Sequence, residues 1–256
     1  MSGVTRFYRV LADGVPRYVC QREGDEARLV DGTLFGDWAP GAPISLEGRR
    51  LLAPLVPGKL IGIGLNYRDH ALERKKPIPA HPLVFLKPPS AVIGPGETIV
   101  LPPGVGRVDH EAEFAIVIGR RARRVTGEDA RAHLFGFTCV NGLTPRALQD
   151  AGIQYSHAKG YDTFAPLGPC IATGLDDSDL EVSGTVNGVV RQRSTTAQLI
   201  FGVDSLIAYI SAIMTLEPGD VIATGTPAGI APLQAGDEVV VRVAGVGALA
   251  NPVVAG

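Results

Sequence analysis

Short apolar runs, broken at regular intervals by glycine and proline, are the dominant pattern along the chain. Glycine and proline contribute 32 and 20 of the 256 residues, and most of the runs between them are too short for long helices. This punctuation favours many strands joined by tight turns over a helical bundle. The predicted fold class is therefore α+β and mostly β, with few helices.

The first fifty residues alternate between polar and apolar side chains. The alternation predicts strands at residues 5–10, 16–20 and 27–30, which glycine and aspartate turns separate. Residues 52–57 contain two prolines and have the composition of a linker. We therefore expect a small N-terminal β domain at residues 1–56 and a catalytic domain at residues 57–256.

Helical signals are few. Residues 68–75 are predicted to form a short helix, and a second is expected at 127–134, where Thr126 is a suitable N-cap. Residues 196–216 form the longest candidate, with apolar side chains at helical spacing that predict packing against the sheets. Asn187-Gly188, between two apolar stretches, predicts a type I′ hairpin turn.

Composition and charge narrow the classes of partner and location. A formal net charge of -2 gives no reason to expect nucleic acid or an anionic membrane as a partner. No apolar run approaches the ~20 residues of a membrane span, and the first ten residues lack a signal-peptide core. The three cysteines are odd in number and lie in apolar surroundings, which indicates buried, reduced thiols. We expect a cytoplasmic protein without nucleic-acid or membrane partners.

The stretch at residues 109–119 carries the first candidate chemistry. If the strand beginning at Phe114 extends backwards, Glu111 and Glu113 lie on one face, ~7 Å apart. Two carboxylates this close repel each other unless a positive charge lies between them. A hard cation such as Mg²⁺, Mn²⁺ or Ca²⁺ meets that need. Two ordinary surface acids at a strand start are the alternative, and spacing alone does not decide.

The second candidate lies at residues 61–73. Gly62 and Gly64 resemble the start of a dinucleotide-binding fingerprint, but the third glycine is missing, which argues against that interpretation. His70 and Glu73 are three positions apart and share one helical face. A carboxylate beside an imidazole raises its pKa and fixes its orientation, as a general base acting on water requires. An exposed His–Glu pair without a function is the alternative.

Five motifs in a fixed order together resemble the catalytic domain of the fumarylacetoacetate hydrolase family, from about residue 59 to the end. Each motif alone is weak, but the ordered set is specific. The first fifty residues resemble the small β domain of many bacterial members, including isomerases of 2-hydroxyhepta-2,4-diene-1,7-dioate and acylpyruvases. The motifs are GLNYRDHALE at 64–73, PLVFLKP at 82–88, DHEAE at 109–113, KGYDTF at 159–164 and GDVIATGTPAG at 219–229.

The resemblance implies a roll of mixed, sandwiched β-sheets with few helices, usually as a homodimer. It also implies a divalent cation held by Glu111 and Glu113, with Mg²⁺ expected first and Mn²⁺ or Ca²⁺ as alternatives. A third ligand in the family is the first Asp of Asn-Asp-x-[Ser/Thr]-Ala-Arg-Asp. The matching stretch at 141–149 has Gly142 at that Asp and Ala147 at the later one. We therefore expect the ion to be held weakly.

The resemblance further implies a role for each remaining residue. His70 and Glu73 would form a water-activating dyad on a mobile lid, and Lys159 would stabilise the negative charge that develops on the substrate. The substrate would be a small oxo acid. Its carboxylate or oxo oxygens would be held by Gln149 and Thr226, with Arg146 behind the site.

The implied reaction is metal-assisted hydrolysis of a C–C bond in a small β-diketo or acylpyruvate-type acid, through an enolate. Isomerisation or decarboxylation of hydroxymuconate-type ring-cleavage products, or of oxaloacetate, is an alternative that the sequence does not resolve. Gly142 leaves a third possibility, a catalytically impaired binding protein of the same fold. An active enzyme is favoured because decay would have altered the other matching residues too, which are His70, Glu73, Glu111, Glu113 and Lys159.

Overall fold

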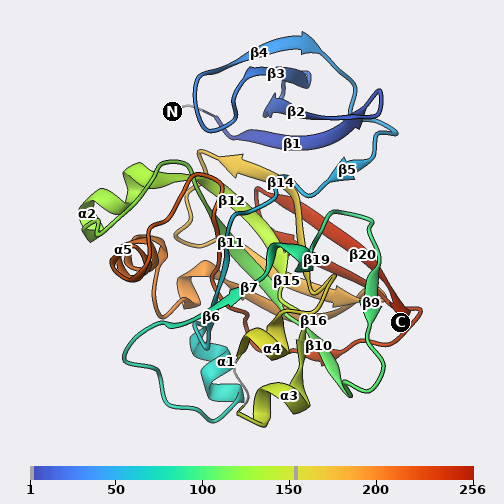
Figure 1. Cartoon of the computed structure of the whole chain (residues 1–256), viewed down its shortest axis with the longest axis vertical. Helices are drawn as coiled ribbons and strands as arrows, with labels where there is room; N and C mark the ends of the chain where they lie inside the picture. The colour runs from blue at the N-terminus through green and yellow to red at the C-terminus, as the bar shows by residue number, and fades with distance from the viewer. Residues whose placement is uncertain (1–2, 153–154) are drawn as a thin grey trace.

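The computed structural model describes residues 3–152 and 155–256, and strands dominate it (Figure 1). The helices of the described residues are short, so the predicted mostly-β α+β class is confirmed. The N-terminal strands are β1 (Thr5–Ala12), β2 (Val15–Arg22), β3 (Arg28–Gly32), β4 (Trp38–Pro43) and β5 (Leu51–Leu52).

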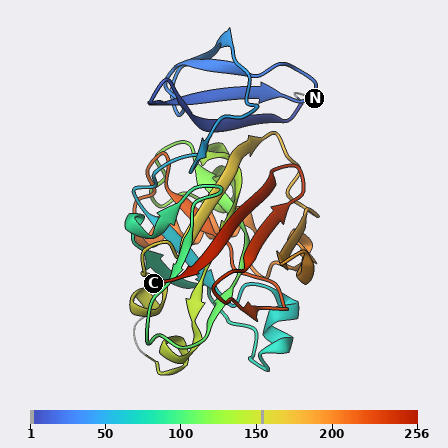
Figure 2. The ribbon, with the colours of Figure 1, turned by 90° about the vertical axis from the view of Figure 1, so that its right-hand side faces the viewer.

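The N-terminal strands form a layer at one end of the molecule (Figure 2). The three strands predicted there correspond to β1, β2 and β3, whereas β4 was missed. The sequence of β4 is WAPGAP, which lacks alternation, and its prolines are tolerated because β4 is an edge strand paired only with β3. β1 also pairs with β14 (Ala165–Thr173), so this layer continues the main sheet. The division into two domains at residue 56 stays a prediction.

The main sheet runs in the order β4-β3-β2-β1-β14-β12-β11-β17-β6-β7. All seven residues of its strand β11 are buried, and the apolar run FAIVI at 114–118 makes up most of it. A strand buried on both faces needs such a run, whereas a half-exposed strand would alternate. The remaining members are β12 (Leu134–Asn141), β17 (Val221–Ala223), β6 (Leu60–Gly64), β7 (Leu83–Lys87) and, paired with β14, β8 (Val92–Ile93).

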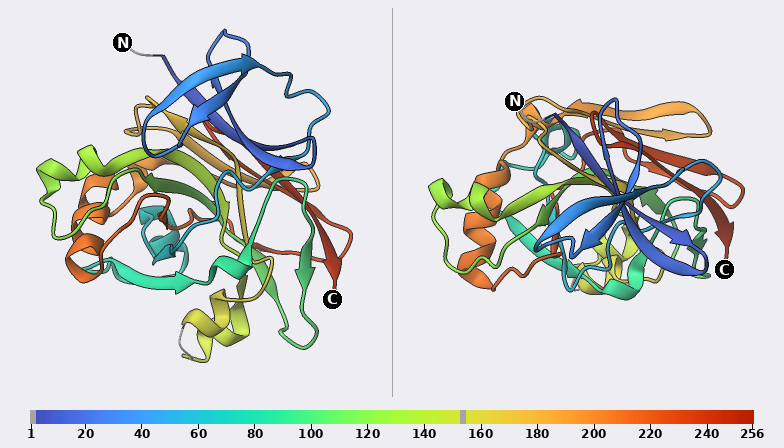
Figure 3. Two further views of the ribbon diagram at one scale, coloured as in Figure 1. Left: turned by 45° about the horizontal axis from the view of Figure 1, so that its top comes forward. Right: turned by 90° about the horizontal axis from the view of Figure 1, so that it is seen from above.

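A five-stranded sheet, in the order β16-β15-β19-β20-β9, packs beside the main sheet (Figure 3). The predicted hairpin joins β15 to β16, and Asn187 and Gly188 have φ values of 52° and 75°, as a type I′ turn requires. A smaller sheet contains β13, β10 and β18. The bounds are β9 (Ile99–Leu101), β10 (Val108–His110), β13 (Thr144–Pro145), β15 (Glu181–Val186), β16 (Val189–Thr195), β18 (Ala231–Pro232), β19 (Glu238–Val243) and β20 (Gly247–Ala255).

Two of the predicted helices are confirmed. The segment at 68–75 contains α1, and the segment at 127–134 contains α2 followed by a 3₁₀ turn at Arg131–His133. The Thr126 hydroxyl accepts a hydrogen bond from the Asp129 amide at 3.3 Å, as expected of an N-cap. The α-helices are α1 (Arg68–Glu73), α2 (Gly127–Ala130), α3 (Arg146–Asp150), α4 (Tyr155–Lys159) and α5 (Val203–Ile213). None of the helices in the described ranges is long and apolar enough to cross a membrane.

The helix predicted at residues 196–216 was wrong in extent, because only α5 within it is α-helical. Tertiary contacts recruit the preceding residues instead: Leu199 forms a β-bridge with Tyr67, and the Ile200 amide donates to the Asn66 carbonyl at 2.8 Å. The apolar spacing therefore reflected core burial on both sides of Gly202 rather than one continuous helix. The three cysteines are buried and unpaired, as predicted.

Asn66 fastens the loop before α1 to the core, and its removal should destabilise the fold. Its side-chain amide donates to the carbonyls of Phe201 and Thr224 at 3.1 and 2.8 Å, and its oxygen accepts from the Phe201 amide at 2.8 Å. Asn66→Ala should lower the free energy of unfolding by about 2–3 kcal/mol, because buried backbone groups lose their partners. Gln198→Ala, at an exposed amide, should change it by less than about 0.5 kcal/mol in the same denaturant titration. Equal losses would contradict this role.

Candidate active site

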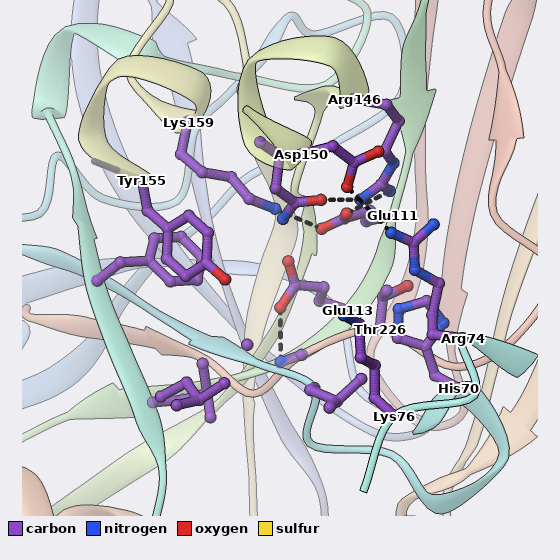
Figure 4. A pocket seen from close by; sticks show the side chains of 17 residues that line it. His70, Arg74, Lys76, Glu111, Glu113, Arg146, Asp150, Tyr155, Lys159 and Thr226 are labelled. Atoms are coloured by element: carbon purple, nitrogen blue, oxygen red, sulfur yellow. Dashed lines mark hydrogen bonds and ion pairs between the residues drawn. The ribbon is translucent and has the colours of Figure 1, made fainter. Parts of the chain in front are cut away.

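A cavity of about 360 Å³ opens between α1, α3, α4 and the ends of β6 and β11 (Figure 4). Most of the candidate residues line it, although they come from segments far apart in the chain. The polar lining residues are His70, Arg74, Lys76, Glu111, Glu113, Arg146, Gln149, Asp150, Tyr155, Lys159 and Thr226, and the apolar lining includes Ile63, Leu65, Leu83 and Phe85.

Glu111 lies between β10 and β11 rather than within one continuous strand, which corrects the strand expected from the sequence. Its amide donates to the Asn141 side chain at 3.0 Å, and its carboxylate accepts from Arg146 at 2.5 Å and from Lys159 at 2.8 Å. Burial opposes ionisation of this group. The charges of Lys159 and Arg146 outweigh burial and hold the Glu111 pKa well below its usual range. Glu111 is therefore a fully paired carboxylate.

Glu113 has the opposite environment. One of its oxygens accepts from the Gly225 amide at 2.7 Å, and no cationic side chain pairs with it among the described residues. Burial, reinforced by the negative charge of Glu111, raises the pKa of Glu113 to about 7. Glu113 is thus the carboxylate that lacks a counter-charge near neutral pH.

Gly142 faces both glutamates. A Cβ atom at this position would lie 3.3 Å from Glu111 Oε2 and would clash with Glu113 Oε1. The carboxylate of Glu113 therefore occupies the space into which a side chain at position 142 would project. An Asp here would reach the two glutamates if Glu113 changed its rotamer.

The donor set fits a divalent cation, though with few protein ligands. No group of three or more metal-binding His, Cys, Asp or Glu side chains occurs within residues 3–152 and 155–256. Mg²⁺ often uses only one or two protein carboxylates, with water and substrate oxygens completing its coordination. The unpaired charge of Glu113 favours a cation, whereas Lys159 and Arg146 compete with it for Glu111. Weak binding, held mainly by Glu113, is what this donor set supports.

His70 and Glu73 lie together on α1, as their spacing predicted. His70 Nδ1 and Glu73 Oε2 are 2.9 Å apart, and the other Glu73 oxygen accepts from the Gly229 amide at 2.9 Å. His70 lines the cavity and is only 7% exposed. With Nδ1 tied to Glu73, Nε2 is the ring nitrogen left for proton exchange within the cavity.

Lys159 reaches the cavity from α4. Its ammonium donates to Glu111 and, at 2.5 Å, to the Thr144 hydroxyl, and it lies 5.2 Å from the centre of the Phe85 ring. Phe85 packs so closely over Gly62 that a Cβ there would clash with the ring. Gly62 therefore serves packing, which agrees with rejecting a dinucleotide fingerprint.

Arg146, Gln149 and Thr226 also line the cavity. Arg146 donates to Asp109 at 2.7 Å and to the Gln149 side-chain oxygen at 2.6 Å. The Thr226 hydroxyl donates to the Ala112 carbonyl at 3.0 Å and accepts from the side-chain amide of Gln192 at 2.7 Å. Because its only proton is already donated, Thr226 must give up that bond before it can donate to a substrate.

Comparison with known proteins identifies the family. The family model described as fumarylacetoacetate hydrolase, C-terminal, matches residues 59–254. The chain belongs to the fumarylacetoacetate hydrolase family. Among solved structures, 2-hydroxyhepta-2,4-diene-1,7-dioate isomerase from Mycobacterium marinum has a TM-score of 0.90 at 38% identity, covering 98% of each chain.

Two further relatives show the chemistry found in the fumarylacetoacetate hydrolase family. Maleylpyruvate hydrolase from Sphingobium sp. SYK-6, solved with manganese(II) and pyruvate, has a TM-score of 0.81 at 34% identity, covering 98% of this chain and 99% of that one. The mitochondrial oxaloacetate tautomerase FAHD2A of Bos taurus is 40% identical over 79% of this chain and 69% of its own. Members of the family thus include hydrolases, isomerases and tautomerases.

The structure adds residues that sequence reasoning on this family member missed. Thr144 links Lys159 to Glu111, and it lay within the family pattern at 141–149, so the signal was available. Lys87 lies in the PLVFLKP motif, and burial together with the Lys159 charge lowers its pKa to about 7. Arg74 and Lys76 also line the cavity. They belong to the basic run RKK at 74–76, and nothing in its sequence distinguishes it from an ordinary exposed surface segment.

Restoring a carboxylate at position 142 should tighten metal binding. Gly142→Asp adds a third oxygen ligand beside Glu111 and Glu113, provided Glu113 moves aside. Calorimetric titration with Mg²⁺ or Mn²⁺, with and without oxalate, should show an affinity at least about tenfold higher than in the wild type. Gly142→Ala, which requires the same movement of Glu113 without adding a ligand, should not tighten binding. An affinity unchanged by the aspartate would refute this placement of the third ligand.

Metal affinity should also depend on pH through Glu113. A cation binds only the ionised carboxylate, and the Glu113 pKa of about 7 means that protons compete below neutrality. The apparent Mn²⁺ affinity should fall by about tenfold per pH unit below 7 and level off above it. Glu113→Gln should abolish both the metal binding and this dependence on pH. An affinity that does not change between pH 5 and 8 would contradict the assignment of Glu113 as the principal ligand.

Proposed function

We propose that this protein is a metal-assisted hydrolase that cleaves a C–C bond in a small β-diketo or acylpyruvate-type acid. The observation that carries the proposal is the convergence of two chemical units on one cavity. The His70–Glu73 pair enters from α1, and the Lys159–Glu111 pair enters from α4 and the β10–β11 junction. One unit can move a proton while the other holds negative charge.

The residues divide the work as follows. His70 Nε2 accepts a proton from water, whose oxygen forms a bond to the substrate carbonyl carbon, and Glu73 stabilises the resulting imidazolium. When the C–C bond breaks, its electron pair passes to the leaving fragment as an enolate, and Lys159 donates a hydrogen bond to the enolate oxygen. The proton held by His70 then returns to the carbon of that fragment. A divalent cation, when bound, would polarise the substrate carbonyl.

A second candidate function is that of a tautomerase or isomerase, or of a decarboxylase acting on the same oxo acids. Gly142 favours it, because enolisation needs a proton acceptor and an oxyanion donor but depends less on a strongly held Lewis acid. His70 and Lys159 supply both functions. The tautomerase among the relatives agrees with this possibility. Both candidates use the same enolate-forming site, and a small oxo acid is the proposed substrate for either. That the protein forms a homodimer stays a prediction.

A substrate panel distinguishes the candidates. Acetylpyruvate and maleylpyruvate report hydrolysis, oxaloacetate reports tautomerisation and decarboxylation, and a hydroxymuconate-type diacid reports isomerisation. Each assay is run with Mn²⁺ and after removal of metal by chelation. Turnover of an acylpyruvate that requires metal supports the hydrolase, whereas metal-independent turnover of oxaloacetate alone supports the tautomerase. Tight oxalate binding with no turnover of any substrate would overturn both and leave a binding protein.

The two chemical units should have separable kinetic roles. His70→Ala should lower kcat by about 10²–10⁴, because the general base is lost. Lys159→Met should lower kcat by about 10²–10³ through loss of the oxyanion donor. Glu73→Gln should lower it less and shift the acidic limb of the pH–rate profile. His157→Ala, a histidine of α4 that does not line the cavity, is the control and should keep activity within about twofold. Full activity in His70→Ala would refute the assignment.

A further inference from the structure

We infer that Gln192 is a positioning residue, which holds the Thr226 hydroxyl as a hydrogen-bond acceptor for the water that attacks the substrate. This inference rests on the proposed function, because it concerns the water of the proposed hydrolysis. Gln192 lies on β16 and is fully buried, although the other residues of that strand are exposed or half-buried. It does not line the cavity, so it acts through Thr226, which does.

Two backbone groups fix the orientation of the Gln192 side-chain amide. Its oxygen accepts from the Ala112 amide at 2.9 Å, and its nitrogen donates to the Pro227 carbonyl at 2.7 Å. A flipped amide would bring two donors together at Ala112 and two acceptors together at Pro227, and burial makes such unmade hydrogen bonds costly. The second proton on the Gln192 nitrogen is therefore directed at Thr226 Oγ1, which lies 2.7 Å away.

The Thr226 hydroxyl consequently has a defined polarity. Because it accepts from Gln192, its single proton points elsewhere, and the Ala112 carbonyl accepts that proton at 3.0 Å. A hydroxyl has one proton and two lone pairs. Within residues 3–152 and 155–256 these are its two hydrogen bonds, so one lone pair is left for the cavity. A carboxylate or oxo oxygen offers no proton to such an acceptor, whereas water does.

Hydrogen bonds hold α1 along the segment at 224–229, which contains Thr226. The Asn66 side chain, just before the helix, donates to the carbonyl of the first residue of this segment at 2.8 Å. Glu73, at the end of the helix, accepts from the amide of the last residue of the segment at 2.9 Å. His70 lies midway along α1 and Thr226 midway along the segment, and both line the cavity (Figure 4).

A further contact attaches α1 to the strand that carries Gln192. The Asp69 carboxylate accepts from the Ser194 hydroxyl at 2.6 Å. Because side chains alternate along a strand, Ser194 and Gln192 lie on the same face of β16. The residue next to His70 is thus tied to the face of β16 that positions Thr226, so the two acceptors are held in one framework.

A water molecule between His70 and Thr226 would have a partner for each of its protons. His70 Nε2 removes one proton as the water oxygen forms its bond to the substrate carbonyl carbon, and the carbonyl π electron pair moves onto the carbonyl oxygen. The other proton stays on the attacking oxygen and is held by Thr226. Two acceptors at fixed positions direct the free lone pairs of the water toward the carbonyl carbon.

Hydrolysis needs this water, whereas enolisation of the product does not. The last proposed step, protonation of the enolate by His70, is the reverse of removing a methyl proton from pyruvate. The experiment therefore compares two rates in the presence of Mg²⁺: hydrolysis of acetylpyruvate, and deuterium exchange into the methyl group of pyruvate in D₂O, followed by mass spectrometry. The affinity for oxalate is measured by calorimetry on the same proteins.

The variants are Gln192→Met, which removes the amide with little change in length, and Thr226→Val, which removes the hydroxyl and keeps the shape. Asn251→Leu is the matched control. Asn251 is also a buried amide, and its nitrogen donates to the carbonyls of Gly94 and Glu97 at 2.9 and 2.8 Å, but it does not line the cavity. Its replacement should lower the free energy of unfolding and leave the ratio of hydrolysis to exchange unchanged.

The ratio of hydrolysis to exchange should fall by about 10- to 10²-fold in Gln192→Met and in Thr226→Val, because the water loses a fixed acceptor. The affinity for oxalate should stay within about twofold, since Thr226 does not hold the oxo acid. Thr226→Ser, which keeps the hydroxyl, should lower the ratio less than Thr226→Val. If Gln192→Met does not fold, Thr226→Val decides the outcome.

An unchanged ratio in either variant would overturn the inference while leaving the proposed hydrolase intact. A loss of oxalate affinity as large as the loss of hydrolysis would also overturn it, because Thr226 would then contact the substrate. Absence of acylpyruvate hydrolysis in the wild type, with or without exchange, would instead refute the proposed hydrolase and the role of its water together.

Discussion

The buried carboxylate of Glu111 is the group on which the site depends. Arg146 reaches it from the start of α3, Thr144 from the adjoining β13 and Lys159 from α4, so one charge holds two separate pieces of chain at the β10–β11 junction. A buried ion is tolerated only when its partners are all in place, and removal of one partner leaves an uncompensated charge. The position of Lys159 beside the cavity is therefore a consequence of the pairing of Glu111.

Two glutamates two positions apart have opposite electrostatic roles. Glu111 is ionised by its cationic neighbours, and the resulting negative charge is one of the causes that raise the pKa of Glu113. The protein thus supplies the counter-charge of one carboxylate and leaves the other available to an exogenous cation. Gly142 adds to this difference, because position 142 supplies no third carboxylate to bind a cation together with Glu113. Environments that push two pKa values apart are typical of sites that combine acid–base and electrophilic chemistry.

The cavity is rigid at its inner end and held more loosely at its mouth. The inner residues are joined by buried ion pairs, whereas the end of α1 is attached to its neighbours by the Glu73–Gly229 hydrogen bond and the exposed Arg74–Asp150 pair. Protein segments open locally where they have few buried contacts and are held by solvent-exposed hydrogen bonds or ion pairs. This contrast suits a site that must orient a reacting group while admitting a substrate past His70.

The sequence alone determined the features set by local chemistry. Periodicity and turn residues gave the mostly-β class, the Asn187-Gly188 hairpin and the Thr126 cap, and ordered motifs identified the family and drew attention to Gly142. Local signals failed where tertiary contacts determine the structure. Leu199 and Ile200 are not helical, because they bond to the loop before α1. Glu111 lies at a strand junction rather than within one strand. The sequence also did not show that Arg74 and Lys76 line the cavity, because that depends on how the chain turns after α1. Charge pairing and burial depend on residues far apart in the chain, and only the folded structure brings them together.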